Sequence, residues 1–411
     1  MTPRRGSYAV ADLALADAGQ ARIEWAEGQM PVLEQLRERF AAERPLEGVK
    51  VAACLHVTAE TANLVRTLLA GGASASLCAA NPFTTQDDVA AALVVHHAAT
   101  VRARRGEDAA AHARHLERVL EAKPQILIDD GAELIAGASG DLLGAIEETT
   151  TGLVRARALA KEGALHCAVL AANEALTERV FNDRYGTGQS TLDGILRATN
   201  LLLAGRTLVV LGYGHTGKGV ALRAKGAGAA VIVCEVEPLP ALEAKMDGFE
   251  VIPALRAAER GDVFVTVTGA PDVLRREHFE RMKDGAVLAN AGHFDVEISL
   301  DDLAEAATQP PREVLPLVDQ YELPGRRLNL LAKGRVVNLA AASGHPAAVM
   351  DISFAAQALG VAYLQRSELP AGVHPVPIEI DREVARLKLD TLGVRIDALS
   401  AEQRRYLRSF R

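Results

Sequence analysis

The stretch Leu208-Val-Val-Leu-Gly212-Tyr-Gly214-His-Thr-Gly217 runs into a helical segment and then into Val231-Ile-Val-Cys-Glu235. An apolar strand is thus followed by a glycine turn, a helix and a second apolar strand that ends in an acid. This order is typical of the βαβ unit that binds dinucleotides. It predicts both the local fold and a cofactor site at the turn, whereas the alternative is a structural glycine turn without a ligand.

Each glycine of this turn has its own physical role. Gly212 permits the tight turn off the strand, Gly214 lets the backbone approach a pyrophosphate, and Gly217 lets the helix pack closely on the strand. The N-terminus of the helix presents unpaired N–H groups and its positive dipole end to the phosphates. Glu235 can accept hydrogen bonds from ribose hydroxyls, and its charge would repel a 2′-phosphate. The stretch therefore predicts NAD rather than NADP.

Composition narrows the class of protein. A chain of 411 residues is too long for one ordinary hydrophobic core, so we expect two or more domains. The net charge of −8 argues against a general binder of nucleic acid or of membrane surfaces. No apolar run approaches the ~20 residues that cross a bilayer, and no signal peptide is recognised. The four cysteines (Cys54, Cys78, Cys167 and Cys234) lack metal-ligand spacing, so we expect reduced thiols, no metal site and a cytoplasmic protein.

Polar residues follow apolar runs in the first half of the chain. The runs 49–55, 125–128 and 167–171 are predicted to be strands, and they lead to His56, Asp130 and Asn173. Strands that alternate with helices indicate a parallel sheet, in which ligands bind beyond the carboxyl ends of the strands. We therefore expect these three residues to meet at one edge of a sheet, with Glu148 among them. Taken singly, His56, Thr58 and Asp130 are equally explained as helix caps.

The second half continues the alternation of strands and helices. Strands are predicted at 250–252, 263–267, 286–288 and 314–317, a hairpin at 326–338 with its turn at Lys333-Gly334-Arg335, and helices at 347–364 and 381–388. The predicted fold class is α/β, with two Rossmann-like doubly wound parallel-sheet domains. The cleft between the two domains is the expected active site.

Long, ordered motifs extend from about Asp12 to Leu407. They include His56, Asp130, Glu147-Glu148-Thr-Thr-Thr-Gly152, the 212–235 unit, Asn290-Ala-Gly292-His293-Phe294-Asp295 and Gly344-His345-Pro346. In these motifs the sequence resembles the S-adenosylhomocysteine hydrolase family. The resemblance implies a discontinuous substrate-binding domain (1–184 and 346–385), an inserted NAD-binding domain (185–345) and a short C-terminal arm (386–411). It also implies a small-molecule adenine nucleoside substrate and a homo-oligomer, either a tetramer or a dimer.

The family's chemistry explains why a hydrolase would need NAD. The ribose 3′-hydroxyl is oxidised to a ketone, which acidifies the 4′ hydrogen. A base removes that hydrogen, and the 5′ substituent leaves by β-elimination. Water then adds to the alkene and the ketone is reduced, so that NAD returns unchanged in each cycle.

The resemblance also assigns roles to individual residues. His56 and Asp130 would serve acid–base chemistry at the 5′ position, and Glu148 would bind the ribose hydroxyls. The other residues placed at the reacting ribose are Glu178, Asn182 and His293. The adenine would be surrounded by Thr58, Glu60, Thr61, His345 and Met350. The cofactor would be contacted by Thr149, Thr150, Thr151, Asp183, Gly212, Gly214, His215, Thr216, Gly217, Glu235, Thr268, Gly292 and Asn338.

One segment departs from the family pattern. Where the family has Asn-Asp-Ser-Val-Thr-Lys-Ser-Lys-Phe-Asp-Asn, the sequence here is Asn173-Glu-Ala-Leu-Thr-Glu178-Arg-Val-Phe-Asn182-Asp183. The lysine that attends the 3′-hydroxyl thus becomes Glu178, and the next aspartate becomes Asn182. A glutamate can still accept the hydroxyl proton if burial raises its pKa. The alternative is a degraded site with Glu178 pointing to solvent. The family's C-terminal lysine and tyrosine, which reach a neighbouring subunit, also have no counterpart here.

These departures shape the expected function. We expect an NAD-dependent hydrolase or lyase that oxidises an adenine nucleoside at the 3′ position and eliminates its 5′ substituent. One form is a nucleoside dehydratase of natural-product biosynthesis, which would expel a 5′-hydroxyl as water. The alternative is an ordinary S-adenosyl-L-homocysteine hydrolase that gives adenosine and homocysteine. A second alternative is a non-catalytic regulator that binds NAD or a nucleoside.

Overall fold

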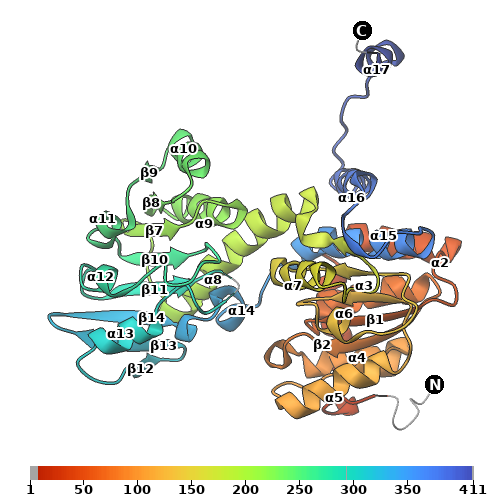
Figure 1. The fold of residues 1–411 in the computed structure, drawn as a ribbon, viewed down its shortest axis with the longest axis horizontal. Coiled ribbons are helices and arrows are strands. Elements are labelled where there is room, and N and C mark those ends of the chain that lie inside the picture. Colours follow the sequence, from red (N-terminus) through yellow and green to blue (C-terminus); the bar gives the residue numbers. More distant parts are fainter. Residues whose placement is uncertain (1–7, 293, 410–411) are drawn as a thin grey trace.

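The computed structural model describes residues 8–292 and 294–409. It contains two sheets, which form the centres of two lobes that lie side by side (Figure 1). Hydrophobic cores lie on both faces of each sheet, so both sheets are doubly wound. The α/β class with Rossmann-like sheets is therefore confirmed.

The first sheet is entirely parallel. Its strand order is β15 (Gly372–Pro375), β6 (Ala168–Ala171), β5 (Gly144–Glu147), β4 (Ile126–Asp129), β1 (Lys50–Leu55), β2 (Ser74–Ala79) and β3 (Thr100–Arg102). Side chains alternate between the two faces: Val51 and Ala53 pack in one core, while Ala52 and Cys54 pack in the other. The chain reverses its direction of winding between β1 and β4, which is where ligands bind in such sheets.

Helices from both ends of the chain cover this sheet. They are α1 (Ala16–Glu27), α2 (Pro31–Glu43), α3 (Ala59–Ala70), α4 (Asp87–His97), α5 (Ala109–Leu120), α6 (Glu133–Gly137), α7 (Thr150–Lys161), α15 (Ala347–Gln365) and α16 (Ile378–Thr391), with 3₁₀ turns at Leu13–Leu15, Pro82–Thr84 and Ala172–Glu174. By length and composition alone, α15 could span a membrane. However, 67% of its apolar window is buried inside the protein, as in the core helix of a globular fold.

The second sheet is parallel except at one edge. Its order is β12 (Arg312–Leu315), β13 (Val318–Leu323), β14 (Arg326–Leu331), β11 (Ala286–Asn290), β10 (Val263–Thr266), β7 (Thr207–Leu211), β8 (Ala230–Cys234) and β9 (Glu250–Val251), with β13 antiparallel to both neighbours. The helices are α8 (Gly188–Thr199), α9 (His215–Gly226), α10 (Pro238–Met246), α11 (Ala254–Ala258), α12 (Arg276–Phe279), α13 (Leu300–Ala306) and α14 (Val337–Ala340), with a 3₁₀ turn at Ala332–Gly334.

Two local predictions fail at the antiparallel edge. The hairpin predicted around Lys333 is wrong, because β14 pairs with β13 through a turn that contains Gly325 at a φ of +77°. The strand predicted to end at residue 317 ends at Leu315, since Leu317 adopts a φ of +67° in the next turn. The two turns are therefore formed by the Pro-Gly pair that ends at Gly325 and by Leu317, whose backbone is in the left-handed region.

Two segments link or leave the lobes. A π-helix, Glu178–Thr187, continues directly into α8 and contacts both α15 and α9.

Beyond α16, residues 392–409 are exposed and end in α17 (Ala401–Arg408), which projects away from both lobes (Figure 1). The predicted start of the C-terminal arm, residue 386, therefore lies inside α16. The segment that projects from the lobes begins after this helix ends.

Candidate active site

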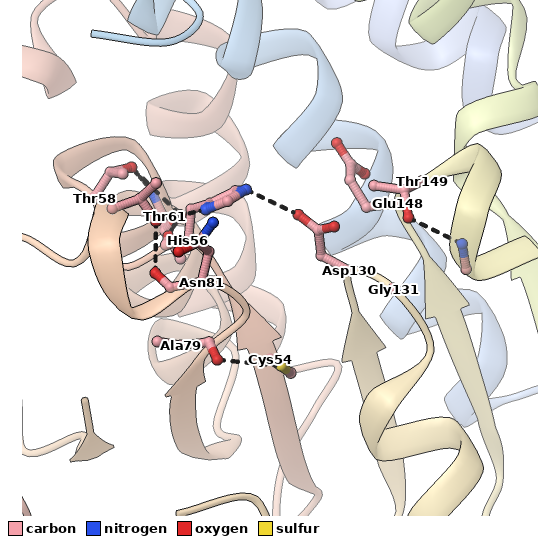
Figure 2. Close-up of polar contacts among 12 residues, drawn as sticks. Cys54, His56, Thr58, Thr61, Ala79, Asn81, Asp130, Gly131, Glu148 and Thr149 are labelled. Atoms are coloured by element: carbon pink, nitrogen blue, oxygen red, sulfur yellow. Dashed lines mark hydrogen bonds and ion pairs between the residues drawn. The ribbon is translucent and has the colours of Figure 1, made fainter. Parts of the chain in front are cut away.

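The carboxyl ends of β1, β4, β5 and β6 are neighbours, so they bring His56, Asp130, Glu148 and Asn173 to one edge. Figure 2 shows His56 and Asp130 pointing toward each other, with Nε2 and Oδ2 3.4 Å apart. On its other side, Nδ1 of His56 lies 2.7 Å from the hydroxyl of Thr84. The imidazole is thus held between a hydroxyl and a carboxylate, which suits proton transfer.

Adjacent glutamates at the end of β5 have different tasks. The buried Glu147 accepts hydrogen bonds from the backbone N–H groups of Gly131 and Ala132 at 2.9 Å and of Thr149 at 3.0 Å. It therefore ties the loop that carries Asp130 to the loop that carries Glu148. The sequence alone assigned no role to Glu147. Successive side chains of a strand point to opposite faces of the sheet, and this alternation is the signal that could have given Glu147 and Glu148 different roles.

Glu148 is held from a distant part of the sequence. Its Oε1 accepts a 2.9 Å hydrogen bond from Ser353, and its Oε2 accepts one from the amide of Gln357, both on α15. Burial, and next the charge of Glu178, raise the pKa of Glu148 well above its usual range. Ser353 and Gln357 were missed from sequence because they lie about 200 residues away, on a helix with no polar motif.

The π-helix presents Glu178 and Asn182 to the same region. Glu178 is only 2% exposed, so the alternative in which it points to solvent is wrong. Its Oε2 accepts a 2.7 Å hydrogen bond from Nδ2 of Asn182, whereas its Oε1 has no hydrogen-bond partner among the described residues. π-helical turns are rare and occur mostly at functional sites.

A buried aspartate of α16 fixes the start of the π-helix. Asp381 accepts hydrogen bonds from the backbone N–H groups of Leu176 and Thr177 at 3.0 Å, and from the Thr177 hydroxyl at 2.6 Å. The first turn of the helix that carries Glu178 is therefore anchored to the C-terminal part of the protein. Sequence reasoning missed Asp381 as well.

The residues expected around adenine divide into two groups. Thr58 caps α3 by accepting from the Thr61 N–H, and the Thr61 hydroxyl donates to the backbone oxygen of His56, so both hydroxyls support the local structure. His345 and Glu60 instead line a cavity of about 280 Å³. Burial lowers the pKa of His345 to about 4, and its buried Nδ1 has no partner among the described residues. Met350 packs against the nearby core.

The glycine turn fits a dinucleotide. Gly212 adopts a φ of +104°, and a Cβ on Gly217 would lie 2.1 Å from the Gly212 oxygen. Around Gly214 nothing lies within 4 Å of such an atom, so the approach to the backbone is open. Glu235 accepts a 2.7 Å hydrogen bond from the N–H of Tyr213 and thus lies beside the turn. His215 and Thr216 form the N-terminus of α9, where the phosphates are expected.

The remaining residues assigned to the cofactor lie at the start of α7, in the π-helix, in α14 and in the loops after β10 and β11. The Thr149 hydroxyl donates to Glu147, and that of Thr150 donates to Asn173. Thr151 is partly buried at the start of α7. Buried Asn338 has an unpaired Oδ1 among the described atoms, and burial raises the pKa of Asp183 to about 6.

Two buried side chains shape the loops after β10 and β11. Glu297 accepts hydrogen bonds from the N–H and hydroxyl of Thr268. Asn290 accepts from the N–H of Gly292 and donates to the oxygens of Gly292 and Phe294. His293 lies outside the described residues. Within residues 8–292 and 294–409, no cluster of three or more His, Cys, Asp and Glu side chains suits a metal, and the four cysteines are buried and unpaired.

Comparisons with known proteins cover both lobes. Residues 7–140 match the model of the S-adenosyl-L-homocysteine hydrolase family, and residues 183–344 match that of its NAD binding domain. An adenosylhomocysteinase of Aquifex aeolicus is 57% identical over 98% of this protein and 99% of its own length. An S-inosyl-L-homocysteine hydrolase of Methanopyrus kandleri is 50% identical over 99% and 98%. The dipicolinate synthase structure of Bacillus subtilis, at 12% identity and a TM-score of 0.50 over 78% of this protein and 98% of its own length, shares the fold alone.

Proposed function

The chain belongs to the S-adenosylhomocysteine hydrolase family, and from that premise we propose that it hydrolyses S-adenosyl-L-homocysteine to adenosine and homocysteine. It is an NAD-dependent enzyme of that family. The observation that supports the proposal most strongly is the His56–Asp130 pair beside Glu148, where the winding of the first sheet reverses. The glycine turn that fits NAD lies in the other lobe.

The relatives change the order of the expected functions. Proteins named adenosylhomocysteinase that match nearly the whole sequence support the hydrolase, which was the alternative from sequence. They give no support to the nucleoside dehydratase that the altered segment suggested. Membership of an enzyme family likewise favours a catalyst over a non-catalytic regulator.

The residues at the strand ends divide the chemistry at the ribose. When bound, NAD supplies the electron acceptor for the 3′ carbon. Glu148, fixed by Ser353 and Gln357, is positioned to accept hydrogen bonds from the ribose hydroxyls. His56, oriented by Thr84 and Asp130, holds and transfers the proton at the 5′ position. His293, which lies outside the described residues, remains assigned to the ribose and nicotinamide by resemblance.

The base of the nucleoside is proposed to be adenine rather than hypoxanthine. The Glu60 carboxylate lines the cavity with His345 and can only accept hydrogen bonds. It therefore suits the amino group of adenine and would repel the oxygen that hypoxanthine carries there. Neutral His345 offers its unpaired Nδ1 to the same ring.

Thiol release tests this function directly. The full-length protein, loaded with NAD, is mixed with S-adenosyl-L-homocysteine or with S-inosyl-L-homocysteine, and free homocysteine is measured. We expect release from the adenosyl compound, with a lower kcat/KM for the inosyl compound. Asp130→Asn is expected to reduce turnover by roughly 10²-fold, whereas the exposed control His166→Asn leaves it unchanged. No homocysteine from either compound would overturn the proposal.

Assembly and location complete the proposal. We assign 1–184 and 346–385 to substrate binding, 185–345 to NAD and the projecting end to contacts between copies of a cytoplasmic homo-oligomer. The exposed residues 392–409 and the four buried free thiols support this assignment. Removal of residues 392–411 is expected to lower the mass measured by light scattering to that of a smaller assembly, whereas an unchanged mass would contradict the role of the arm.

A further inference from the structure

We propose that Glu148 and Glu178 form a buried carboxylate pair that holds one proton, and that Glu178 takes the proton of the ribose 3′-hydroxyl. This role deepens the proposed function, because it requires oxidation at the 3′ position but not any one leaving group. It places a carboxylate where the family pattern has a lysine. Three arguments support it: the hydrogen bonds of the pair, the charges around it and the balance of the chemical step.

The hydrogen bonds leave one oxygen of the pair free. Asn182 donates to Oε2 of Glu178 at 2.7 Å, and Ser353 and Gln357 donate to the two oxygens of Glu148. The Ser353 hydroxyl has a single proton, which is given to Glu148 at 2.9 Å. Oε1 of Glu178 is then a buried acceptor without a donor among the described residues. A substrate hydroxyl would supply that donor.

The charges around Glu178 favour a shared proton. Glu148 faces it from the end of β5, Asp183 from the same π-helix and Asp381 from α16. Burial raises the pKa of Glu178 to about 7 and raises that of Glu148 as well, while the hydrogen bonds from Asn182 to Glu178 and from Ser353 to Glu148 oppose the rise. Two buried carboxyl groups that interact lose their protons in separate steps that belong to the pair.

Two lysines on the neighbouring elements are already engaged in ion pairs. On α15 the buried Asp351 pairs with Lys388 of α16 at 2.8 Å. Burial raises the pKa of Asp183, and the charge of Arg179, on the π-helix, opposes that rise. On α9, Lys218 pairs with Glu243 at 2.6 Å. The residues of α15 that contact the pair are the neutral Ser353 and Gln357, so the proton itself is the charge that balances the two carboxylates.

The chemical step balances with this assignment. The O–H bond of the 3′-hydroxyl breaks and its proton passes to the Glu178 carboxylate. The C3′–H bond breaks with both of its electrons passing to the nicotinamide ring of NAD, and the C3′–O bond becomes a carbonyl. At the end of the cycle the same proton returns from Glu178 to the 3′ oxygen. Asn182 is a positioning residue, because its amide fixes Oε2 and leaves Oε1 to the substrate.

The oxidation half-reaction tests the pair by itself. Full-length protein loaded with NAD is mixed rapidly with adenosine, and the rate of NADH absorbance is followed from pH 5 to 9. We expect the wild-type rate to rise with pH and to level off above neutrality. Glu178→Gln, which keeps the size of the side chain, is expected to lower the rate by at least 10²-fold and to abolish this pH dependence. Glu174→Gln, whose target lies at the surface in an ion pair with Arg157, serves as the control.

A second variant separates positioning from folding. Asn182→Asp adds a negative charge next to Glu178, so the pH profile is expected to move upward by about one unit or more. NAD content and thermal stability, measured for every variant, verify that each protein is folded. A Glu178→Gln protein that binds NAD and keeps the wild-type rate and pH profile would overturn the pair.

The two proposals fail separately. NADH formation that depends on Glu178, without homocysteine release, would support the pair and refute the hydrolase. Homocysteine release that is unchanged in Glu178→Gln would support the hydrolase and refute the pair. A wild-type protein that forms no NADH with adenosine would refute the role of Glu178.

Discussion

The glycine turn and the proposed ribose site, formed by His56, Asp130, Glu148 and Glu178, both lie where the winding of a sheet reverses, yet they are built differently. The turn is a contiguous stretch from Gly212 to Gly217 whose backbone conformation makes the site. The ribose site collects side chains from three strand ends, the π-helix and α15. A backbone-built site tolerates little change in shape, whereas a site built from side chains can change its charge while the fold stays intact.

This difference indicates which parts of an enzyme can change in sequence while the fold is kept. The fingerprint at Gly212 is present in full, while Glu178, proposed to act at the 3′-hydroxyl, lies where the family pattern has a lysine. Glu178 nevertheless lies buried beside Glu148, held by Asn182. Steric substitutions should therefore be most damaging in the turn, and charge substitutions should be most informative in the ribose site.

The largest effect is expected for Gly217→Val. The new Cβ would lie 2.1 Å from the Gly212 oxygen, so α9 must move away from β7 and the phosphate site is lost. We expect NAD binding, measured by calorimetry, to weaken by at least about 10²-fold. Gly226→Ala, in the same helix with open space around it, should bind NAD normally. Normal NAD affinity in Gly217→Val would break the steric half of the comparison.

Asp381→Ala tests the support of the ribose site. It removes the acceptor of three hydrogen bonds and leaves unpaired the part-buried N–H of Leu176 and the buried N–H and hydroxyl of Thr177. We expect a loss of roughly 2–4 kcal/mol in the free energy of unfolding by urea, together with slower NADH formation. Glu379→Ala, at an exposed position of the same helix, should change stability by less than about 0.5 kcal/mol. Equal stabilities for the two variants would contradict the anchoring role.

Glu235→Ser tests the selectivity of the turn. Loss of the carboxylate removes hydrogen bonds to the cofactor ribose and the repulsion of a 2′-phosphate. We expect NAD affinity to fall by roughly 10-fold and NADP to become a measurable competitor. If NADP remains excluded to the same degree, selectivity arises elsewhere in the site.

The smallest effect is the pH dependence of stability at Glu178. Its pKa is raised by burial in the folded state, so its contribution is fully present below the unfolded value near 4.5 and is lost as pH rises through about 7. Glu178→Gln should therefore match the wild type near pH 5 and exceed it at pH 8, on the order of 1 kcal/mol. Urea unfolding at both values checks the sign, and a variant that is less stable at pH 8 would contradict it.

Sequence reasoning succeeded where the information is local or follows from topology. The βαβ unit is contiguous, and parallel strands bring their carboxyl ends to one edge, so His56 and Asp130 were expected to meet. Ser353, Gln357 and Asp381 contact the site only through packing between segments about 200 residues apart, which leaves no local pattern. The π-helix was likewise not predicted, since its spacing of side chains lies close to that of an α-helix.

The pairing of Glu147 and Glu148 shows the same limit on a smaller scale. The two residues are adjacent and chemically identical, yet one ties backbone loops together and the other faces Ser353. Only the exact end of β5 decides which glutamate lies at the proposed ribose site. The sequence alone does not predict the end of a strand to within one residue.

The most direct measurement of the central claim is the infrared carbonyl band of a protonated carboxyl group. Spectra of the full-length protein are recorded from pH 5 to 9, and those of Glu178→Gln are subtracted, which cancels the bands of other buried carboxyl groups such as Asp129 and Glu147. If the pair shares a proton, a difference band persists near neutrality and disappears at higher pH. A difference spectrum in which Glu178 is fully ionised at pH 6 would contradict the shared proton.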